Sequence, residues 1–85
     1  MIPVHVLLFA AHRETMGTNR IDLQVPESCT AEKVFEILCA RRPQLAALRP
    51  WTSFAVNREV SDPETRLKAG DELALLQPVS GGSSD

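Results

Sequence analysis

One helix pattern lies between two pairs of strand patterns, and this order restricts the folds that the chain can adopt. The first pair covers residues 4–10 and 20–25, the helix covers 31–41, and the second pair lies around 54–57 and 73–76. A helix between strands of one sheet belongs to a crossover connection and lies on one face of that sheet. With 85 residues, the chain has room for one small domain. One main helix therefore covers one face of a mixed sheet, and the other face stays uncovered.

The first two strand segments identify the face that we expect to be buried. Alternate residues of the first segment are all apolar: Val4, Val6 and Leu8. The second segment repeats the alternation with Ile21, Leu23 and Val25. Successive side chains of a strand point to opposite faces, so these two sets predict the core side of the sheet. On the opposite side the first strand begins polar at His5 and becomes apolar at Leu7 and Phe9.

The central helix has recognisable ends. Thr30 is a suitable N-cap, and Pro43 ends the helix because it disfavours the α conformation at the residue before it. The helix carries one apolar stripe, which consists of Ala31, Val34, Phe35, Ile37 and Leu38. Residues 44–48 predict a short second helix, and residues 11–19 predict a connection that starts with a helical turn. The charged pair Arg13 and Glu14 in that connection is expected to be solvated.

The last strand leaves apolar side chains that the helix does not cover. Leu73 and Leu75 face one way, whereas Ala74 and Leu76 face the other. Together with Phe9 and Val60, Leu76 predicts an apolar patch on the uncovered face. On a protein of this size, such a patch is an association surface.

The chain ends in a stretch that we expect to be flexible. Pro78 has no amide hydrogen, so strand pairing should stop there, and no apolar residue follows Val79. Gly81 and Gly82 have no side chains and could enter a channel too narrow for any other dipeptide. We therefore predict a domain over residues 1–78 and a tail over 79–85.

Composition excludes several classes of function. The net charge of −2 and the pI of about 5.6 argue against a basic surface for nucleic acid or anionic lipid. No apolar run approaches the ~20 residues that span a bilayer, and no basic segment precedes the first apolar run, so a cytoplasmic protein is expected.

The residue types that usually carry catalysis are scattered. Cys29 and Cys39 form no CxxC pair and are expected to be reduced apolar fillers. His5 and His12 lie at opposite ends of the first strand, so each is expected to be an edge or loop histidine rather than a metal ligand. The sequence has no Gly-rich phosphate loop, GxSxG or HExxH motif. These observations indicate a protein that other proteins act upon, not an independent enzyme.

Five short motifs in a fixed order point to a family. They occupy residues 6–10, Arg13 and Glu14 with Gly17, 55–57, Leu67 with 70–73, and 78–82. The last motif, Pro-Val-Ser-Gly-Gly, follows Gly-Asp-Glu-Leu and a strand. In this order the motifs resemble the small subunit of molybdopterin synthase, the ubiquitin-like sulfur carrier of the MoaD and ThiS family. The resemblance extends from the first strand through Gly82 and implies a β-grasp fold.

The resemblance also implies a chemistry centred on Gly82. A MoeB-like adenylating enzyme would use ATP to join the Gly82 carboxyl to AMP, and a sulfur donor protein would then convert it to a thiocarboxylate. A MoaE-like large subunit would receive the tail and transfer the sulfur to a pterin precursor. Phe9, Leu76 and Val60 would dock on that subunit, and Pro78, Val79, Ser80 and Gly81 would thread the tail. The resemblance implies no permanently bound cofactor, only transient AMP and sulfur at Gly82.

The sequence departs from the family pattern after Gly82, because Ser83, Ser84 and Asp85 follow it. Family members typically end at the second glycine, so we hypothesise that a peptidase trims the chain after Gly82. The alternatives are that the three residues are an artificial extension or that the carrier is inactive. Three other functions stay open. They are a ThiS-like carrier, which residues 44–51 argue against, a protein modifier joined through Gly82 to lysines, and a β-grasp module that only binds a partner.

Overall fold

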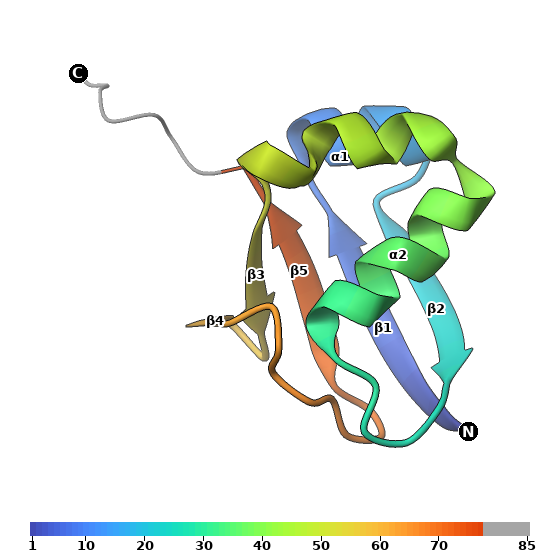
Figure 1. The fold of residues 1–85 in the computed structure, drawn as a ribbon, viewed down its shortest axis with the longest axis vertical. Coiled ribbons are helices and arrows are strands. Elements are labelled where there is room, and N and C mark those ends of the chain that lie inside the picture. The colour runs from blue at the N-terminus through green and yellow to red at the C-terminus, as the bar shows by residue number, and fades with distance from the viewer. Residues whose placement is uncertain (78–85) are drawn as a thin grey trace.

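Five strands form one mixed sheet in the computed structural model, which describes residues 1–77. Their bounds are β1 (Ile2–Leu8), β2 (Arg20–Val25), β3 (Ser53–Val56), β4 (Glu59–Ser61) and β5 (Glu72–Leu76). The order across the sheet is β2-β1-β5-β3-β4, as Figure 1 shows. The central strands β1 and β5 are parallel, and every other neighbouring pair is antiparallel. The mixed sheet expected from the sequence is confirmed.

The helices are divided between one face and one end of this sheet. Helix α2 (Ala31–Arg41) lies across a single face, whereas α1 (Ala10–Met16) and the 3₁₀ helix η1 (Pro43–Trp51) lie at the end toward which β1 and β5 run (Figure 1). The expected main helix on one face is therefore confirmed. The end that α1 and η1 cover is the end at which β5 finishes.

Local capping explains where the helices begin and end. Thr30 Oγ1 accepts a hydrogen bond from the Lys33 amide at 3.1 Å, which confirms the expected N-cap of α2. Helix α1 ends at Gly17, whose φ of 77° is left-handed and whose amide donates to the Arg13 carbonyl at 2.8 Å. The connection expected over 11–19 therefore contains a helix of two turns rather than one initial turn.

The strand expected around residues 54–57 is the first half of a hairpin. Asn57 and Arg58 have φ values of 51° and 73°, and this pair of left-handed residues turns β3 back into β4. The Asn57 side chain also holds the neighbouring strand, because its Oδ1 accepts from the Glu72 amide at 3.0 Å.

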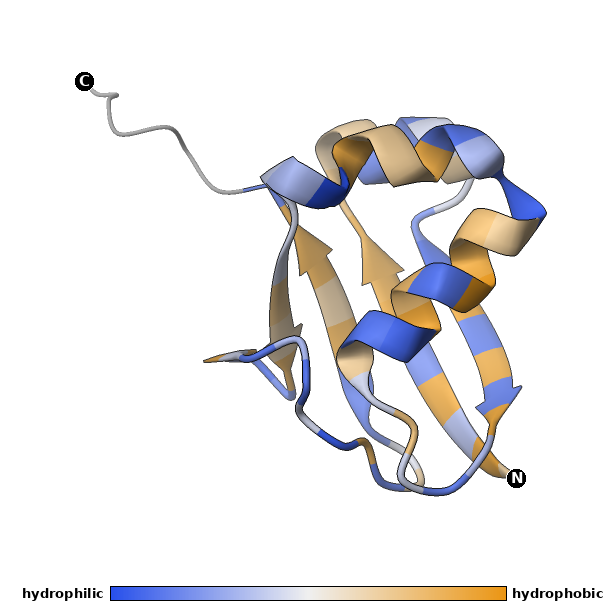
Figure 2. Ribbon diagram, in the orientation of Figure 1, coloured by the Kyte–Doolittle hydropathy of each residue, from blue (hydrophilic) through white to orange (hydrophobic). Residues whose placement is uncertain are grey.

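The core lies between α2 and the sheet face that the sequence predicted. Val4, Val6 and Leu8 are each at most 1% exposed. They belong to one cluster with buried apolar side chains from α2, η1 and the other strands: Leu23, Val25, Ala31, Val34, Phe35, Leu38, Leu45, Phe54, Leu73 and Leu75. Figure 2 shows that β2 alternates between polar and apolar residues, whereas the ends of β1 and β5 that carry the arrowheads are apolar throughout. Those two strand ends are therefore apolar on both faces.

Candidate functional site

The sheet register places one row of side chains on the face opposite α2. Leu7 of β1 is paired with Arg20 of β2 and with Ala74 of β5. Ala74 is paired with Ala55 of β3, which is paired with Val60 of β4. Residues directly opposite each other in neighbouring strands point to the same face. This row therefore crosses all five strands, and four of its five members are apolar.

The three residues predicted to dock on a partner lie around this row. Val60 is 81% exposed at the β4 edge, and Leu76 is half-buried beside Ser53. Phe9 is 47% exposed and has an extended backbone, so its side chain follows the alternation of Leu7 onto the same face. We call Leu7, Phe9, Val60, Ala74 and Leu76 the uncovered apolar face. Its contact with a partner remains a prediction.

A charged cluster borders this apolar face on β1 and β2. His5 Nδ1 lies 2.8 Å from Asp22 Oδ1, and Arg20 Nε donates to the same oxygen at 3.0 Å. The hydrogen bonds from His5 and then from Arg20 hold the pKa of Asp22 below its ordinary value. Asp22 is consequently an anion already engaged by two neighbours, and it fixes the Arg20 side chain along the strand.

An open pocket lies at the end of β1, between the charged cluster and Phe9. It measures about 290 Å³ and is lined by Leu7, Leu8, Phe9, Arg13, Asn19 and Arg20. The lining combines apolar side chains with two guanidinium groups. We call it the Phe9 pocket.

The expectation of edge or loop histidines is wrong for both His5 and His12. His5 lies within β1, which is paired with β2 on one side and β5 on the other. His12 is fully buried in α1, and its Nε2 lies 2.8 Å from Thr52 Oγ1. Because that hydroxyl donates its proton to the Leu48 carbonyl at 2.7 Å, Nε2 must be the donor to Thr52. Nδ1 is buried with no hydrogen-bond partner among the described residues, and burial lowers the pKa of the imidazole. The sequence signal that could have indicated this is the helical spacing of His12 and Met16, the two buried residues of α1.

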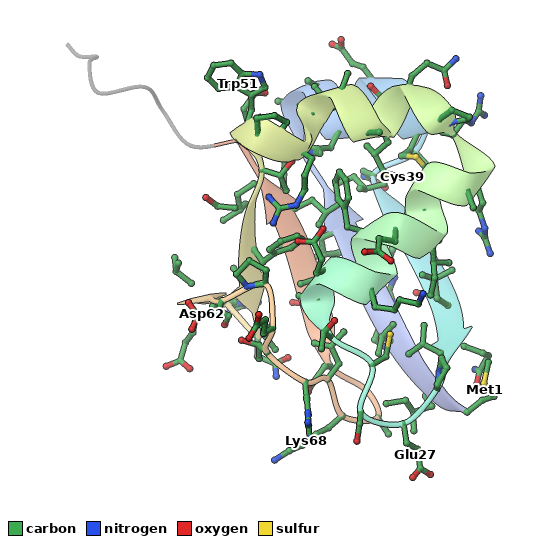
Figure 3. The ribbon with its side chains drawn as sticks, viewed as in Figure 1. Met1, Glu27, Cys39, Trp51, Asp62 and Lys68 are labelled. Atoms are coloured by element: carbon green, nitrogen blue, oxygen red, sulfur yellow. The ribbon has the colours of Figure 1, made fainter. Side chains whose placement is uncertain are left out.

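Trp51 is an exposed aromatic residue that the sequence pattern did not place among the docking residues. It is 59% exposed at the end of η1 (Figure 3). It precedes Thr52 and Ser53, and Ser53 is the partner of Leu76. Trp51 therefore lies beside the end of the sheet at which β5 finishes.

The residues that would carry the chemistry lie outside the part of the chain that the structure describes. These are Pro78, Val79, Ser80, Gly81 and Gly82. Within residues 1–77, no group of three or more His, Cys, Asp or Glu side chains could hold a metal ion. Over the same residues, no helix is long and apolar enough to cross a membrane.

The two cysteines are free thiols within the body of the domain. Cys29 is buried and Cys39 is partly buried, and burial raises the pKa of both thiols. Burial therefore favours the uncharged form of both thiols, and their packing in or against the core agrees with the expected role as apolar fillers.

Comparison with known sequences assigns the chain to a family. The ThiS family matches residues 6–82. A molybdopterin synthase sulfur carrier subunit of Arabidopsis thaliana is 33% identical over 81 residues, which cover 95% of this chain and 84% of the relative. The subunit of the same name from Homo sapiens is 35% identical over 88 residues, with 96% of this chain and 100% of the relative covered.

Solved structures show the same fold. Small archaeal modifier protein 1 of Methanosarcina acetivorans superposes with a TM-score of 0.80 at 28% identity, covering 96% of this chain and 98% of its own. The complex of subunits 1 and 2 of molybdopterin-converting factor from Helicobacter pylori superposes with a TM-score of 0.67 at 22% identity. The match covers 95% of this chain and 100% of the other. A ubiquitin of Caldiarchaeum subterraneum superposes with a TM-score of 0.61 at 17% identity, covering 95% of this chain and 98% of its own. At these low identities, the last two structures show a shared fold and nothing more.

These likenesses agree with the sheet order and the single covering helix, so the expected ubiquitin-like β-grasp fold is confirmed. The family match spans both the folded body and the Gly81-Gly82 pair. The chain belongs to the ThiS family, and its two relatives described above are molybdopterin synthase sulfur carrier subunits.

Proposed function

We propose that this chain is the sulfur-carrier subunit of a molybdopterin synthase and that Gly82 carries the sulfur as a thiocarboxylate. The observation that supports this most is a likeness to sulfur carrier subunits that covers 95% and 96% of the chain in the two relatives above. The family match also ends at Gly82, the residue whose carboxyl the chemistry requires. The cytoplasmic location expected from the sequence is part of the same proposal.

The chemistry needs an activated acyl group at Gly82. A carboxylate is a poor electrophile, because its charge is delocalised and its leaving group would be oxide. A MoeB-like enzyme would join the carboxylate to the α-phosphorus of ATP and release pyrophosphate, which makes AMP the leaving group. A persulfide sulfur of a donor protein would then displace AMP. This forms a carbon–sulfur bond and leaves Gly82 joined to the donor through the sulfur–sulfur bond that the persulfide already contained. A thiol would finally cleave that bond, leaving the thiocarboxylate on Gly82 and a disulfide on the donor side.

The described residues contribute position rather than bond making. The uncovered apolar face provides a surface of stable shape that a MoaE-like large subunit can bind through Phe9, Leu76 and Val60. The Helicobacter pylori structure is itself a complex of subunits 1 and 2 of molybdopterin-converting factor, a pairing of this kind. Because β5 finishes at Leu76 beside this face, docking there would direct residues 78–82 toward the active site of the partner. ATP would be bound by the activating enzyme, and this chain would hold no permanent cofactor.

Ser83 makes proteolytic trimming a part of the proposal, because it ties up the Gly82 carboxyl in a peptide bond. We propose that a peptidase removes Ser83, Ser84 and Asp85. The intact mass of the protein purified from its native host tests this step. A species that ends at Gly82 is expected, and a population that ends only at Asp85 would refute trimming.

Reconstitution tests the carrier function itself. A chain ending at Gly82 would be loaded with sulfur and mixed with the large subunit and the pterin precursor. The expected result is formation of the dithiolene product, with none from the chain that ends at Asp85. If the loaded chain yields no product but still binds the large subunit, the destination of its sulfur is different.

Protein modification is the second candidate function. The likeness to a small archaeal modifier protein, with a TM-score of 0.80 at 28% identity, favours it over a ThiS-like carrier and over a module that only binds a partner. A modifier would use the same activated Gly82 but transfer the acyl group to a lysine amine. Isopeptide-linked adducts in extracts of the native host would support this function, and their absence would leave the sulfur carrier.

A further inference from the structure

We propose that the Phe9 pocket binds an acidic side chain of the large subunit, with Arg13 as the residue that pairs with its carboxylate. This inference rests on the proposed function, because it names the kind of partner segment that the docking surface receives. It adds one ion pair to a docking surface that is otherwise apolar, with the positive charge on this chain and the negative charge on the large subunit.

The position of the pocket makes it part of the docking surface. Leu7 and Phe9 belong both to the uncovered apolar face and to the pocket lining. Arg20 lies directly opposite Leu7 in the register, on the same face. A partner that packs on Phe9 would therefore cover the mouth of the pocket as well.

The two arginines of the pocket differ in how far their charges are already compensated. Arg20 donates to Asp22 Oδ1 at 3.0 Å, and its Nη2 lies 3.2 Å from His5 Nδ1. Arg13 is exposed in the last turn of α1 and forms no ion pair or side-chain hydrogen bond with any other residue in the range 1–77. In a chain of net charge −2, the pocket therefore offers an uncompensated positive charge next to apolar lining residues.

The open shape of the pocket favours a side chain over a small molecule. Small-molecule sites bury most of the ligand, whereas this pocket of about 290 Å³ is open. One Asp or Glu side chain next to an apolar residue fits the lining, because the carboxylate can meet the Arg13 fork while the apolar neighbour packs on Phe9. Partial desolvation of the pair by the partner would strengthen it relative to a free surface contact.

The test is a calorimetric titration of the large subunit with each of four forms of the full chain. The forms are wild type, Arg13→Glu, Arg13→Gln and the matched control Arg66→Glu. Arg66 is exposed, its backbone pairs with Thr30 at the start of α2, and it is not part of the pocket lining. We expect Arg13→Glu to weaken binding about tenfold or more, Arg13→Gln to weaken it less, and Arg66→Glu to leave it within about twofold.

The salt dependence of binding provides a second measurement on the same samples. Added NaCl should weaken wild-type binding more steeply than it weakens binding of Arg13→Gln, because the variant lacks the screened charge pair. Equal affinities for wild type and Arg13→Glu would overturn the pocket inference and leave the proposed function standing. Equal losses in Arg13→Glu and Arg66→Glu would also overturn it, because net charge alone would then explain the effect. If the wild type does not bind the large subunit, the proposed function fails, and the inference fails with it.

A charge exchange identifies the partner residue. Exposed Asp and Glu residues of the large subunit would be replaced one at a time by Arg and tested against Arg13→Glu. At least one replacement should restore binding of Arg13→Glu while weakening binding of the wild type. If no replacement restores it, the assignment of a carboxylate as the occupant is wrong.

Discussion

His12 Nε2 lies 2.8 Å from Thr52 Oγ1, and this hydrogen bond joins α1 to the segment that leads into β3. Phe9 directly precedes α1, and Ser53, the neighbour of Thr52, is paired with Leu76. The buried imidazole therefore connects the Phe9 side and the Leu76 side of the uncovered apolar face. The relative position of Phe9 and Leu76 in the proposed docking surface therefore depends on a buried residue that is not itself part of that surface.

The first prediction concerns the protonation of His12. Burial lowers its pKa in the folded state below the ordinary 6.5, so the unfolded chain binds a proton more readily than the folded chain does. The stability that the neutral form provides is complete above pH 6.5 and is lost as the pH falls through the lowered folded pKa. We expect the free energy of unfolding, measured with urea, to decrease over this acidic range.

Substitutions separate His12 from the other titrating groups. His12→Gln should flatten the dependence of stability on pH below 6.5, although it will itself destabilise the fold because His12 is fully buried. Met16→Ala is the matched control, since Met16 is the other buried residue of α1 and has no titrating group. An unchanged acidic slope in His12→Gln would show that His12 is not the group responsible.

The second prediction concerns Arg49, which links η1 to α2. Its guanidinium forms a two-pronged ion pair with Glu32, with Nε 2.9 and 3.0 Å from the two carboxylate oxygens, and its Cζ lies 5.1 Å from the Phe54 ring centroid. A cation–π contact contributes ~0.5–2 kcal/mol and a partly exposed ion pair ~0.2–1 kcal/mol. Arg49→Ala should therefore lower the free energy of unfolding by about 1–3 kcal/mol.

Arg49→Lys tests the geometry of that contact. Lysine keeps the charge but lacks the planar fork, so we expect the free energy of unfolding of Arg49→Lys to lie between those of wild type and Arg49→Ala. Arg41→Ala at the exposed end of α2 should cost less than about 0.5 kcal/mol. Chemical denaturation measures all three, and a loss in Arg49→Ala no larger than in Arg41→Ala would contradict the proposed role of the pair.

The third prediction concerns the uncovered apolar face. Val60→Lys should leave stability nearly unchanged, because Val60 is 81% exposed, yet weaken binding of the large subunit by placing a charge in a desolvated contact. Leu76→Lys should weaken binding more, at some cost in stability, because Leu76 is half-buried.

Fluorescence provides a direct measurement of this binding. Trp51 is the single tryptophan, the chain has no tyrosine, and Trp51 lies beside the end of the sheet at which β5 finishes. Titration with a large subunit in which tryptophans are replaced by phenylalanine would report the affinity of each variant. Affinities for Val60→Lys and Leu76→Lys equal to that of wild type would remove both residues from the interface.

Local patterns in the sequence were enough to predict most of the core. Alternation predicted the buried side of β1, and the Thr30 cap and Pro43 predicted both ends of α2, because these signals act over a few residues. The single β-grasp domain followed from the order of the elements and from the family resemblance. Residues 78–82, which carry the predicted chemistry, lie outside the described residues, so their roles remain predictions.

Features that depend on contacts between distant residues were not predictable from the sequence. Helix α1 has only seven residues, begins at Ala10 with a φ of 47°, and contains one buried polar residue, so its apolar pattern is weak. The contact of His12 with Thr52 joins residues forty apart. Arg13 was expected to be solvated only. Its place in the Phe9 pocket was not predictable, because that pocket is formed by residues of β1, β2 and α1 together.

The fourth prediction concerns the last glycine. In a chain that ends at residue 82, Gly82→Ala should keep the free energy of unfolding within about 0.5 kcal/mol of wild type, because every core side chain of the described domain is retained. It should nevertheless abolish most sulfur transfer, since the methyl group would obstruct a channel that admits only a bare backbone. Full activity of this variant in the reconstituted synthase would contradict the threading argument.

The most direct measurement of the central claim is the intact mass of the chain after incubation with the activating enzyme, ATP and a sulfur source. The chain that ends at Gly82 should gain the mass of one sulfur-for-oxygen exchange, and fragmentation should assign it to Gly82. The chain that ends at Asp85 should be unchanged. The proposed carrier function would be contradicted if the Gly82 form gains no sulfur, or if the exchange occurs elsewhere in the chain.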